Sequence, residues 1–197
     1  MKLVLAAAAA LGMVAVPAHA QQFSDSYSFL EAVKKRDGGK AEELLAARAS
    51  TIINTKDASS GEGALHILAR GRDRSWLAYM LSKGAKPDLQ NKQGDTPLGI
   101  AAQLGWAEGA ELLLKVGAGV DLPNRRGETP LILAVHARDV SMVRLLLSKG
   151  ANPKRTDNVA GYSALDYAKQ DRRSAAVLKL LEAPPTKPAK EIAGPKL

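Results

Sequence analysis

The chain has 197 residues, of which 46% are hydrophobic but only 4% aromatic, so leucine, alanine and valine must build the core. Such small side chains suit thin stacked layers better than one large globular centre. The chain has no cysteine, which excludes a disulfide framework and thiolate chemistry and argues against a lipoprotein anchor, while its net charge of +8 favours acidic partners, anionic lipid headgroups or acidic envelope polymers.

Residues 1–20 have the pattern of a secretory signal peptide. Lys2 is followed by an uncharged apolar run, Leu3–Val16, and by the small-x-small cleavage pattern Ala18–Ala20. The run is too short to span a bilayer of roughly 30 Å; a buried N-terminal helix is the alternative. We expect export to the periplasm, or release from the cell, and a flexible segment over residues 21–26. An exported protein rarely meets nucleic acid, so we expect no nucleic-acid partner despite the basic charge.

The rest of the chain repeats itself with a period of 33 residues. Three independent sets of residues share this spacing, which is strong evidence for a repeat architecture. They are the Gly-Ala pairs starting at Gly84, Gly117 and Gly150; the glycines Gly61, Gly94 and Gly127; and the leucine runs Leu112–Leu114 and Leu145–Leu147.

The period and the residues resemble the ankyrin repeat. The best matches are Gly94–Leu98 and Gly127–Leu131, which both contain Thr-Pro-Leu and precede an alanine-rich and then a leucine-rich helix. The resemblance covers residues 27–182. It implies an all-α fold, an ankyrin-repeat solenoid of about five helix–turn–helix units with short β-hairpin fingers.

The residues of each unit have recognisable local roles. Thr96 and Thr129 can cap the first helix of their units with a hydroxyl, worth about 1 kcal/mol. Pro97 and Pro130 follow at the first helical position, where a missing N–H costs nothing. The glycine of each Gly-Ala pair ends the second helix, where a left-handed residue is commonly needed.

Five units follow one another along the chain. Their approximate bounds are 27–57, 58–89, 90–122, 123–155 and 156–182. The first is degenerate, as a capping unit can be; the second has Gly63 in place of the capping threonine, which predicts a weaker helix start; the fifth keeps a possible cap in Ser163. Residues 183–197 are rich in proline and lysine, and we expect a disordered tail.

In ankyrin proteins, partners mostly contact the concave face made by the fingers and the first helices. Arg70, Gln103 and His136 share one repeat position and should form a row, and Arg125 with Arg126 would suit an acidic partner because arginine pairs well with carboxylates. The alternative is that these are merely solvated positions. The predicted partner-binding residues are Arg70, Lys92, Gln93, Asp95, Gln103, Leu104, Arg125, Arg126, Glu128 and His136.

One histidine and two tryptophans have more specific expectations. The resemblance gives His66 a structural role, bonding to backbone between repeats, rather than a catalytic or metal-binding one. Trp76 stands 33 residues before Gly109, which suggests that the indole of Trp76 fills the space this glycine leaves. Trp106 begins a second helix, and we expect it to be partly exposed.

No catalytic, phosphate-binding or metal-binding motif is present in the sequence. We therefore expect no enzymatic activity, no cofactor and no metal. The predicted function is a periplasmic adaptor, a monomer without stable membrane insertion, that binds another protein through the concave face. The alternative is an envelope-associated structural protein that uses its basic surface and tail on anionic lipid or cell-wall polymer.

Overall fold

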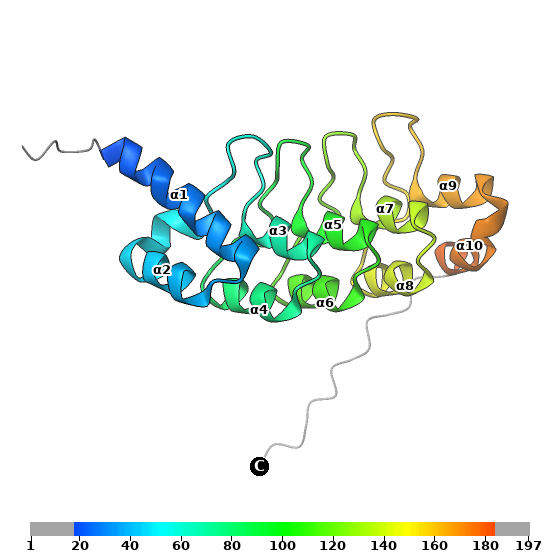
Figure 1. Cartoon of the computed structure of the whole chain (residues 1–197). Helices are drawn as coiled ribbons and strands as arrows, with labels where there is room; N and C mark the ends of the chain where they lie inside the picture. Colours follow the sequence, from blue (N-terminus) through cyan, green and yellow to red (C-terminus); the bar gives the residue numbers. More distant parts are fainter. Residues whose placement is uncertain (1–17, 184–197) are drawn as a thin grey trace, which may run out of the picture.

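The computed structural model describes residues 18–183, apart from the side chains of residues 18–24, 49 and 50. This part of the chain forms helices that follow one another in a regular stack (Figure 1). They are α1 (Ala18–Lys35), α2 (Gly38–Ile52), α3 (Ala64–Arg70), α4 (Arg74–Ser82), α5 (Pro97–Gln103), α6 (Ala107–Lys115), α7 (Pro130–His136), α8 (Val140–Ser148), α9 (Ala164–Gln170) and α10 (Ala175–Glu182), with a 3-10 turn at Arg172–Ser174 before α10.

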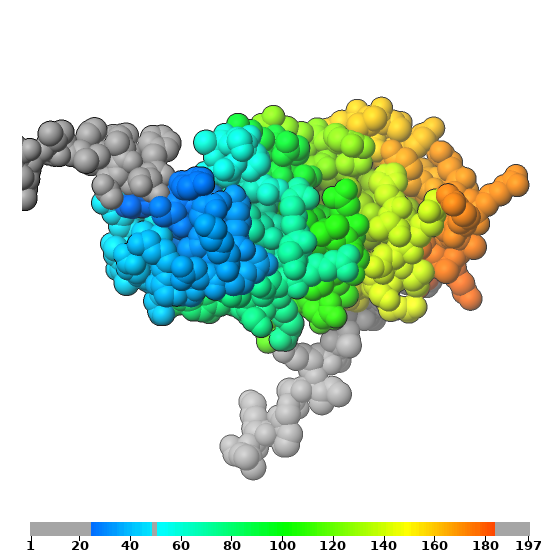
Figure 2. Space-filling view, in the orientation of Figure 1, coloured from blue at the N-terminus to red at the C-terminus, as the bar shows by residue number. Residues whose placement is uncertain are grey.

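The helices form two layers. Helices α1, α3, α5, α7 and α9 contact one another in that order, and α4, α6, α8 and α10 do the same behind them. Each odd-numbered helix also packs on the even-numbered helix that follows it. This arrangement confirms the predicted all-α solenoid, and the space-filling view shows the units succeeding one another along its length (Figure 2).

The N-terminal boundary differs from the expectation. Residues 21–26, predicted to be flexible, lie within α1. Helix α1 also includes the proposed cleavage site at Ala18–Ala20. Residues 1–17 of the predicted signal peptide and residues 184–197 of the predicted tail lie outside the described residues.

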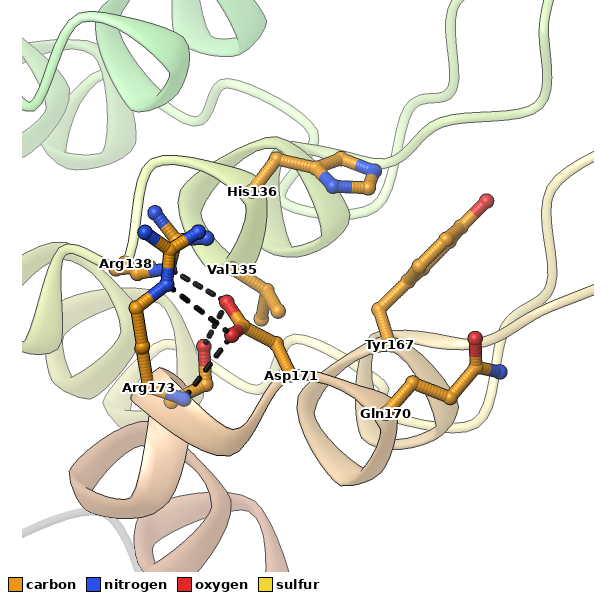
Figure 3. Close-up of a pocket in the computed structure, with 8 residues that line it drawn as sticks. Val135, His136, Arg138, Tyr167, Gln170, Asp171 and Arg173 are labelled. Carbon is orange, nitrogen blue, oxygen red and sulfur yellow. Dashed lines mark hydrogen bonds and ion pairs between the residues drawn. The ribbon is translucent and has the colours of Figure 1, made fainter.

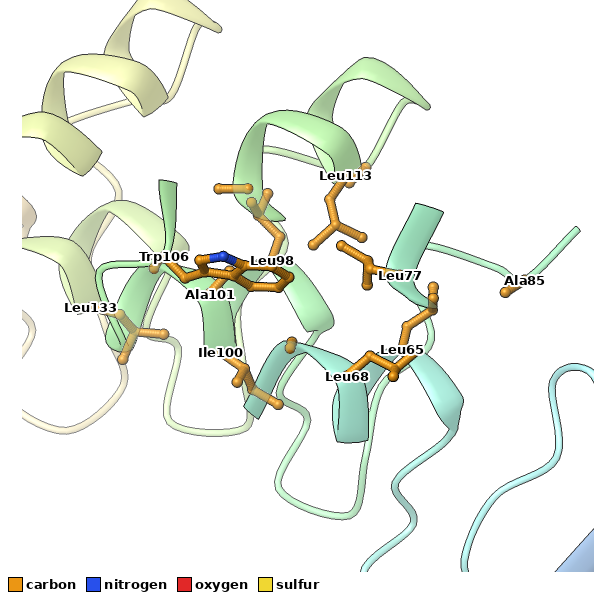
Figure 4. Packing of buried hydrophobic residues seen from close by; sticks show 14 of the residues in the cluster. Leu65, Leu68, Leu77, Ala85, Leu98, Ile100, Ala101, Trp106, Leu113 and Leu133 are labelled. Atoms are coloured by element: carbon orange, nitrogen blue, oxygen red, sulfur yellow. The ribbon is translucent and has the colours of Figure 1, made fainter. Parts of the chain in front are cut away.

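The core consists of aliphatic side chains placed between consecutive units. Leu68 and Leu77 of one helix pair and Leu98 and Leu113 of the next have no exposed surface, and they meet across the boundary between the pairs (Figure 4). Burying a leucine side chain completely stabilises the fold by roughly 1.5–3 kcal/mol. The stack is therefore held by contacts between neighbours rather than by one central core.

The predicted helix starts are confirmed. The hydroxyl of Thr96 accepts a hydrogen bond from the backbone N–H of Gly99 at 3.0 Å, and that of Thr129 accepts from Ile132 at 3.3 Å. Pro97 follows Thr96 at the first helical position. The second helices α4 and α8 have caps that the sequence analysis did not identify, the carboxylates of Asp73 and Asp139.

The fingers are hairpin-shaped loops, but residues 18–183 contain no β-strand beyond an isolated bridge between Thr156 and Ser163. The reason lies in the side chain at each finger base. The amide oxygen of Asn91 accepts backbone hydrogen bonds from Gln93 and Asp95, both at 2.9 Å. These two N–H groups are therefore not available for the backbone hydrogen bonds of a β-sheet.

Neighbouring fingers are joined by backbone hydrogen bonds. Lys92 donates to Ser60 at 3.0 Å, and Arg125 donates to Gln93 at 2.9 Å. Asn158 donates to Arg126 at 2.8 Å. The close approach needs a glycine: Gly94 has a φ of +80°, and a Cβ atom there would lie 2.6 Å from the backbone nitrogen of Arg125.

The space beside Gly109 is filled by Trp106, so the proposed role of Trp76 is wrong. Trp106 is 6% exposed, and a Cβ atom on Gly109 would overlap its ring. The two residues are one helical turn apart, so the indole of the residue before α6 can lie over the glycine. Trp76 is instead half-buried, with its ring 6.0 Å from that of Tyr79.

His66 has the predicted structural role. Its Nδ1 atom accepts a hydrogen bond from the backbone N–H of Gly63 at 3.1 Å, and its Nε2 atom lies 2.9 Å from the carbonyl oxygen of Asp95 in the next unit. Since Nδ1 accepts, Nε2 must carry the proton and donate. The imidazole therefore supplies the return half of a capping box, from the third helical residue to the N-cap N–H, and links two units.

We predict that the effect of Gly109→Ala on stability changes sign with residue 106. In the natural chain the new methyl group meets the indole, and the substitution should lower the free energy of unfolding by roughly 1–3 kcal/mol. With Trp106→Asp already in place, alanine should raise it by up to about 1 kcal/mol, because alanine is the better helix former. Urea unfolding of the four proteins checks this, and a loss of equal size in both backgrounds contradicts it.

We also predict an acid-sensitive contribution from His66. Burial is the largest influence on this side chain and lowers the pKa of His66 below its usual 6.5. The unfolded chain therefore takes up a proton at a higher pH than the folded chain, and stability present above pH 6.5 is lost as the pH falls below it. In urea unfolding at pH 7.5 and 5.5, His66→Gln should be less stable at pH 7.5 but lose less on acidification.

The matched control is His136→Gln, which changes an exposed histidine. This variant should keep the acid sensitivity of the natural chain. If it abolished the sensitivity and His66→Gln did not, the assignment to His66 would be wrong.

Candidate interaction surface on the finger side

The predicted row of residues lies at the ends of successive helices. Arg70, Gln103 and His136 are the last residues of α3, α5 and α7, and all three are exposed. Because these helices pack in order, the side chains begin from equivalent positions along one layer. Arg70 also forms an ion pair with Glu62 at 2.7 Å, so its charge is partly compensated.

Lys92 and Arg125 occupy the same position on consecutive fingers, and both are exposed. The ammonium group of Lys92 donates to the carbonyl oxygen of Ala58 at 2.7 Å, a neutral partner that leaves its charge unbalanced. Within residues 18–183, the guanidinium group of Arg125 has no hydrogen-bond or ion-pair partner. Arg125 can therefore meet an incoming anion without first breaking another contact.

The other arginine of the predicted pair is already engaged. Arg126 donates to Glu128 at 2.9 Å, and the second carboxylate oxygen of Glu128 accepts from Asn124 at 2.9 Å. Glu128 is only 6% exposed, so the expectation that it lies open to a partner is wrong. Its carboxylate faces inward because Asn124, Arg126 and the more distant His136, 4.0 Å away, surround it.

Asp95 and Leu104 also lie partly inside the fold. The side-chain amide of Asn124 donates to the carboxylate of Asp95 at 3.2 Å, which connects two consecutive fingers. Leu104 is half-buried at the end of α5, and its carbonyl oxygen accepts from Arg72. These residues shape the surface more than they are exposed on it.

A hollow of about 390 Å³ lies between the finger that carries Lys92 and the finger that carries Arg125. It brings together seven of the ten predicted residues, and its apolar floor includes Leu133. The lining residues are Lys92, Gln93, Asp95, Gln103, Asn124, Arg125, Arg126, Glu128 and Leu133. Arg70, Leu104 and His136 are not among them.

An aromatic cluster lies next to this hollow. The ring centroid of Tyr167 lies 4.4 Å from that of His136 and 5.5 Å from that of Tyr162, and both pairs are edge-to-face. The phenol of Tyr167 donates to the carboxylate of Asp157, and this hydrogen bond is the main reason that the pKa of Tyr167 rises to about 12. Tyr162 remains 39% exposed, so it offers an apolar contact on a fixed base.

His136 and Tyr167 also line a second hollow of about 340 Å³ between α7 and α9. Figure 3 shows the ion pair of Arg138 and Asp171 at its edge. Sequence reasoning did not single out Tyr167. The available signal was the repeat itself, because Tyr167 stands where the preceding units have Leu133 and Ile100, so it is the aromatic exception at an aliphatic position.

Within residues 18–183, no three histidine, aspartate or glutamate side chains are grouped so that they could hold a metal ion. None of the helices described is both long enough and apolar enough to cross a membrane. Every buried side-chain nitrogen or oxygen among these residues has a hydrogen-bond partner.

We predict that Asn124 matters for stability and Arg125 does not. Asn124→Ala removes the acceptor for the N–H groups of Arg126 and Glu128 and the donor to two carboxylates, which should cost about 2–3 kcal/mol. Arg125→Ala should stay within about 0.5 kcal/mol of the natural chain. Urea unfolding measures both, and equal losses contradict this division of roles.

Comparison with known families agrees with the geometry. The family model described as ankyrin repeats in three copies matches residues 29–124, 65–157 and 110–190. These matches span most of the chain, including all helix pairs after the start of α1. Ankyrin repeats are generally protein–protein interaction modules and typically not enzymes. The chain belongs to the ankyrin-repeat family.

Proposed function

We propose that this protein is a periplasmic adaptor that binds an acidic segment of another protein through its finger side. The family membership supports a protein partner, and the signal-like sequence of residues 1–20 supports export. An ankyrin stack presents an extended concave surface to its partners. The partner we favour is defined by chemistry, as an extended segment that carries a carboxylate beside an apolar side chain.

The observation that carries this proposal is the guanidinium of Arg125. It lines the hollow between two fingers, and it has no partner among residues 18–183. The acidic groups in the same hollow, Asp95 and Glu128, are engaged by Asn124 and Arg126. An incoming carboxylate therefore meets a donor pair suited to it. The charge of Glu128 is offset by Arg126, whereas the charge of Asp95 is not, because the partner of Asp95 is a neutral amide.

The aromatic cluster supplies the apolar part of the same surface. Tyrosine is enriched among the residues that dominate binding energy at interfaces. Tyr162 is held against Tyr167, which Asp157 in turn fixes. A partner side chain that packs on Tyr162 requires little rearrangement of the protein, because the ring of Tyr167 behind it is already held by Asp157.

Arg125→Glu is the substitution that tests this function. Crosslinked pull-down from periplasm should recover a specific partner with the natural chain, and the variant should bind at least tenfold more weakly, since it places a like charge against the partner's carboxylate. Sequencing of the periplasmic protein should begin at Gln21 if the signal is removed as proposed.

The control is Arg74→Glu, which makes the same change in net charge at an exposed residue on α4. Arg126 is a poor choice for this test because its reversal would also expel Glu128 from its contacts. Equal binding by Arg125→Glu and the natural chain would show that Arg125 does not contact the partner. Recovery of the protein from the cytoplasm instead of the periplasm would contradict the proposed location.

The second candidate function is an envelope-associated structural role, favoured by the net charge of +8. A basic surface that holds anionic lipid or polymer does so without a defined site. The affinity of such binding should fall steeply between about 50 and 500 mM salt, because salt screens exposed charges. It should be unchanged in Arg125→Glu. The adaptor function predicts dependence on Arg125 at constant salt.

A further inference from the structure

A second, chemically different surface lies at the far side of the stack, between the ends of α8 and α10. It is a groove of about 630 Å³, which we call the C-terminal groove. Its lining is mainly aliphatic, with two cationic side chains. The lining residues are Arg144, Leu147, Ser148, Gly150, Ala151, Asn152, Pro153, Lys154, Leu180, Leu181 and Ala183.

The earlier units close the equivalent region with a turn. In each of them, a glycine after the second helix takes a left-handed conformation, with φ of +91° at Gly84, +92° at Gly117 and +87° at Gly150. The loop that follows is then tied to the preceding unit by one hydrogen bond. The backbone N–H of Gly119 donates to Asp88 at 2.9 Å, and that of Asn152 donates to Asp121 at 3.1 Å.

The chain departs from this pattern at the residue directly after α10. Ala183 has a φ of −64° and a ψ of +142°, an extended conformation, as expected before a proline. One repeat after Asp121 stands Lys154, which has no acceptor. The carboxylate acceptor that Asp88 and Asp121 supply is therefore not repeated at Lys154.

The charges at the groove are reversed relative to the preceding unit. Arg144 and Lys154 stand one repeat after Glu111 and Asp121. Both cationic side chains are exposed, and neither forms an ion pair with another side chain of the described range. The groove thus combines an aliphatic floor with two uncompensated positive charges at its rim, an arrangement that the preceding unit lacks.

We propose that the C-terminal groove binds the chain of a fatty acid, with Arg144 and Lys154 holding its carboxylate. The volume lies within the range of small-molecule pockets, which are mostly apolar with a few placed polar groups. A protein partner would need a far larger contact area, about 800 Å² from each side. The Lys-rich residues 184–197 of this chain have the wrong charge for the rim, so they are a poor occupant.

Titration calorimetry of the full mature chain with dodecanoate, below its micelle concentration, tests the proposal. Binding should be saturable with one molecule per chain, and each removal of two methylene groups should weaken it roughly tenfold. Dodecyltrimethylammonium has the same chain with the opposite charge and should bind at least tenfold more weakly than dodecanoate. Equal binding of both, or of octanoate and dodecanoate, overturns the proposal.

Two variants locate the site. Ala183→Trp should fill the groove and abolish binding, and Arg144→Glu with Lys154→Glu should weaken dodecanoate at least tenfold, because two attractive charges become repulsive. The matched control, Arg74→Glu with Lys115→Glu, makes the same charge change at exposed residues of α4 and α6 and should bind as the natural chain does.

The remaining outcomes also decide the question. All four substituted residues of the charge variants are exposed, so their thermal unfolding should match that of the natural chain. If dodecanoate binds undiminished to Ala183→Trp, the site is elsewhere. If light scattering shows a dimer that Ala183→Trp separates, the groove is an interface between copies and not a lipid site. Loss of partner binding in Arg125→Glu has no bearing on either result.

Discussion

Contact between successive helix pairs is the interaction on which the rest of this structure depends. Each unit is too thin to hide its own leucines, so the burial of Leu77 depends in part on Leu113 of the next pair. Stability in such an array is approximately a sum of unit and neighbour terms. Polar links between units, such as His66 to Asp95, add to the same neighbour terms.

The same neighbour contacts place the chemistry on the finger side. Asn124 closes its own finger, engages Glu128 within that finger and reaches Asp95 in the preceding one. Acidic groups that the sequence presents as surface residues are thereby drawn into the fold. Arg125, which uses only its backbone N–H for the structure, is left to act on something outside. The adjacent residues Asn124 and Arg125 thus have different roles, the first in stability and the second in the proposed binding.

The solenoid and its helix starts could be predicted because they depend on local, repeated signals: the glycine period, Thr96 before Pro97, and the leucine runs. The other features depend on pairs that the repeat does not contain. Glu128 is buried by Asn124 and Arg126, not by its position in the motif. Trp106 covers Gly109 from the position just before the same helix, so comparison at a spacing of 33 selected the wrong tryptophan. The finger loops avoid strands because of Asn91 and Asn124, whose role as acceptors was not recognised.

The backbone bonds between fingers have a mechanical consequence. Hydrogen bonds connect each finger to the next, from Ser60 to Lys92, Gln93 to Arg125 and Arg126 to Asn158. The motion of each finger is therefore restrained by its neighbours. A molecule that docks on a single finger therefore meets a surface whose motions are already restrained by its neighbours. Less freedom is lost on association with a surface ordered in advance, so more of the contact energy remains as affinity.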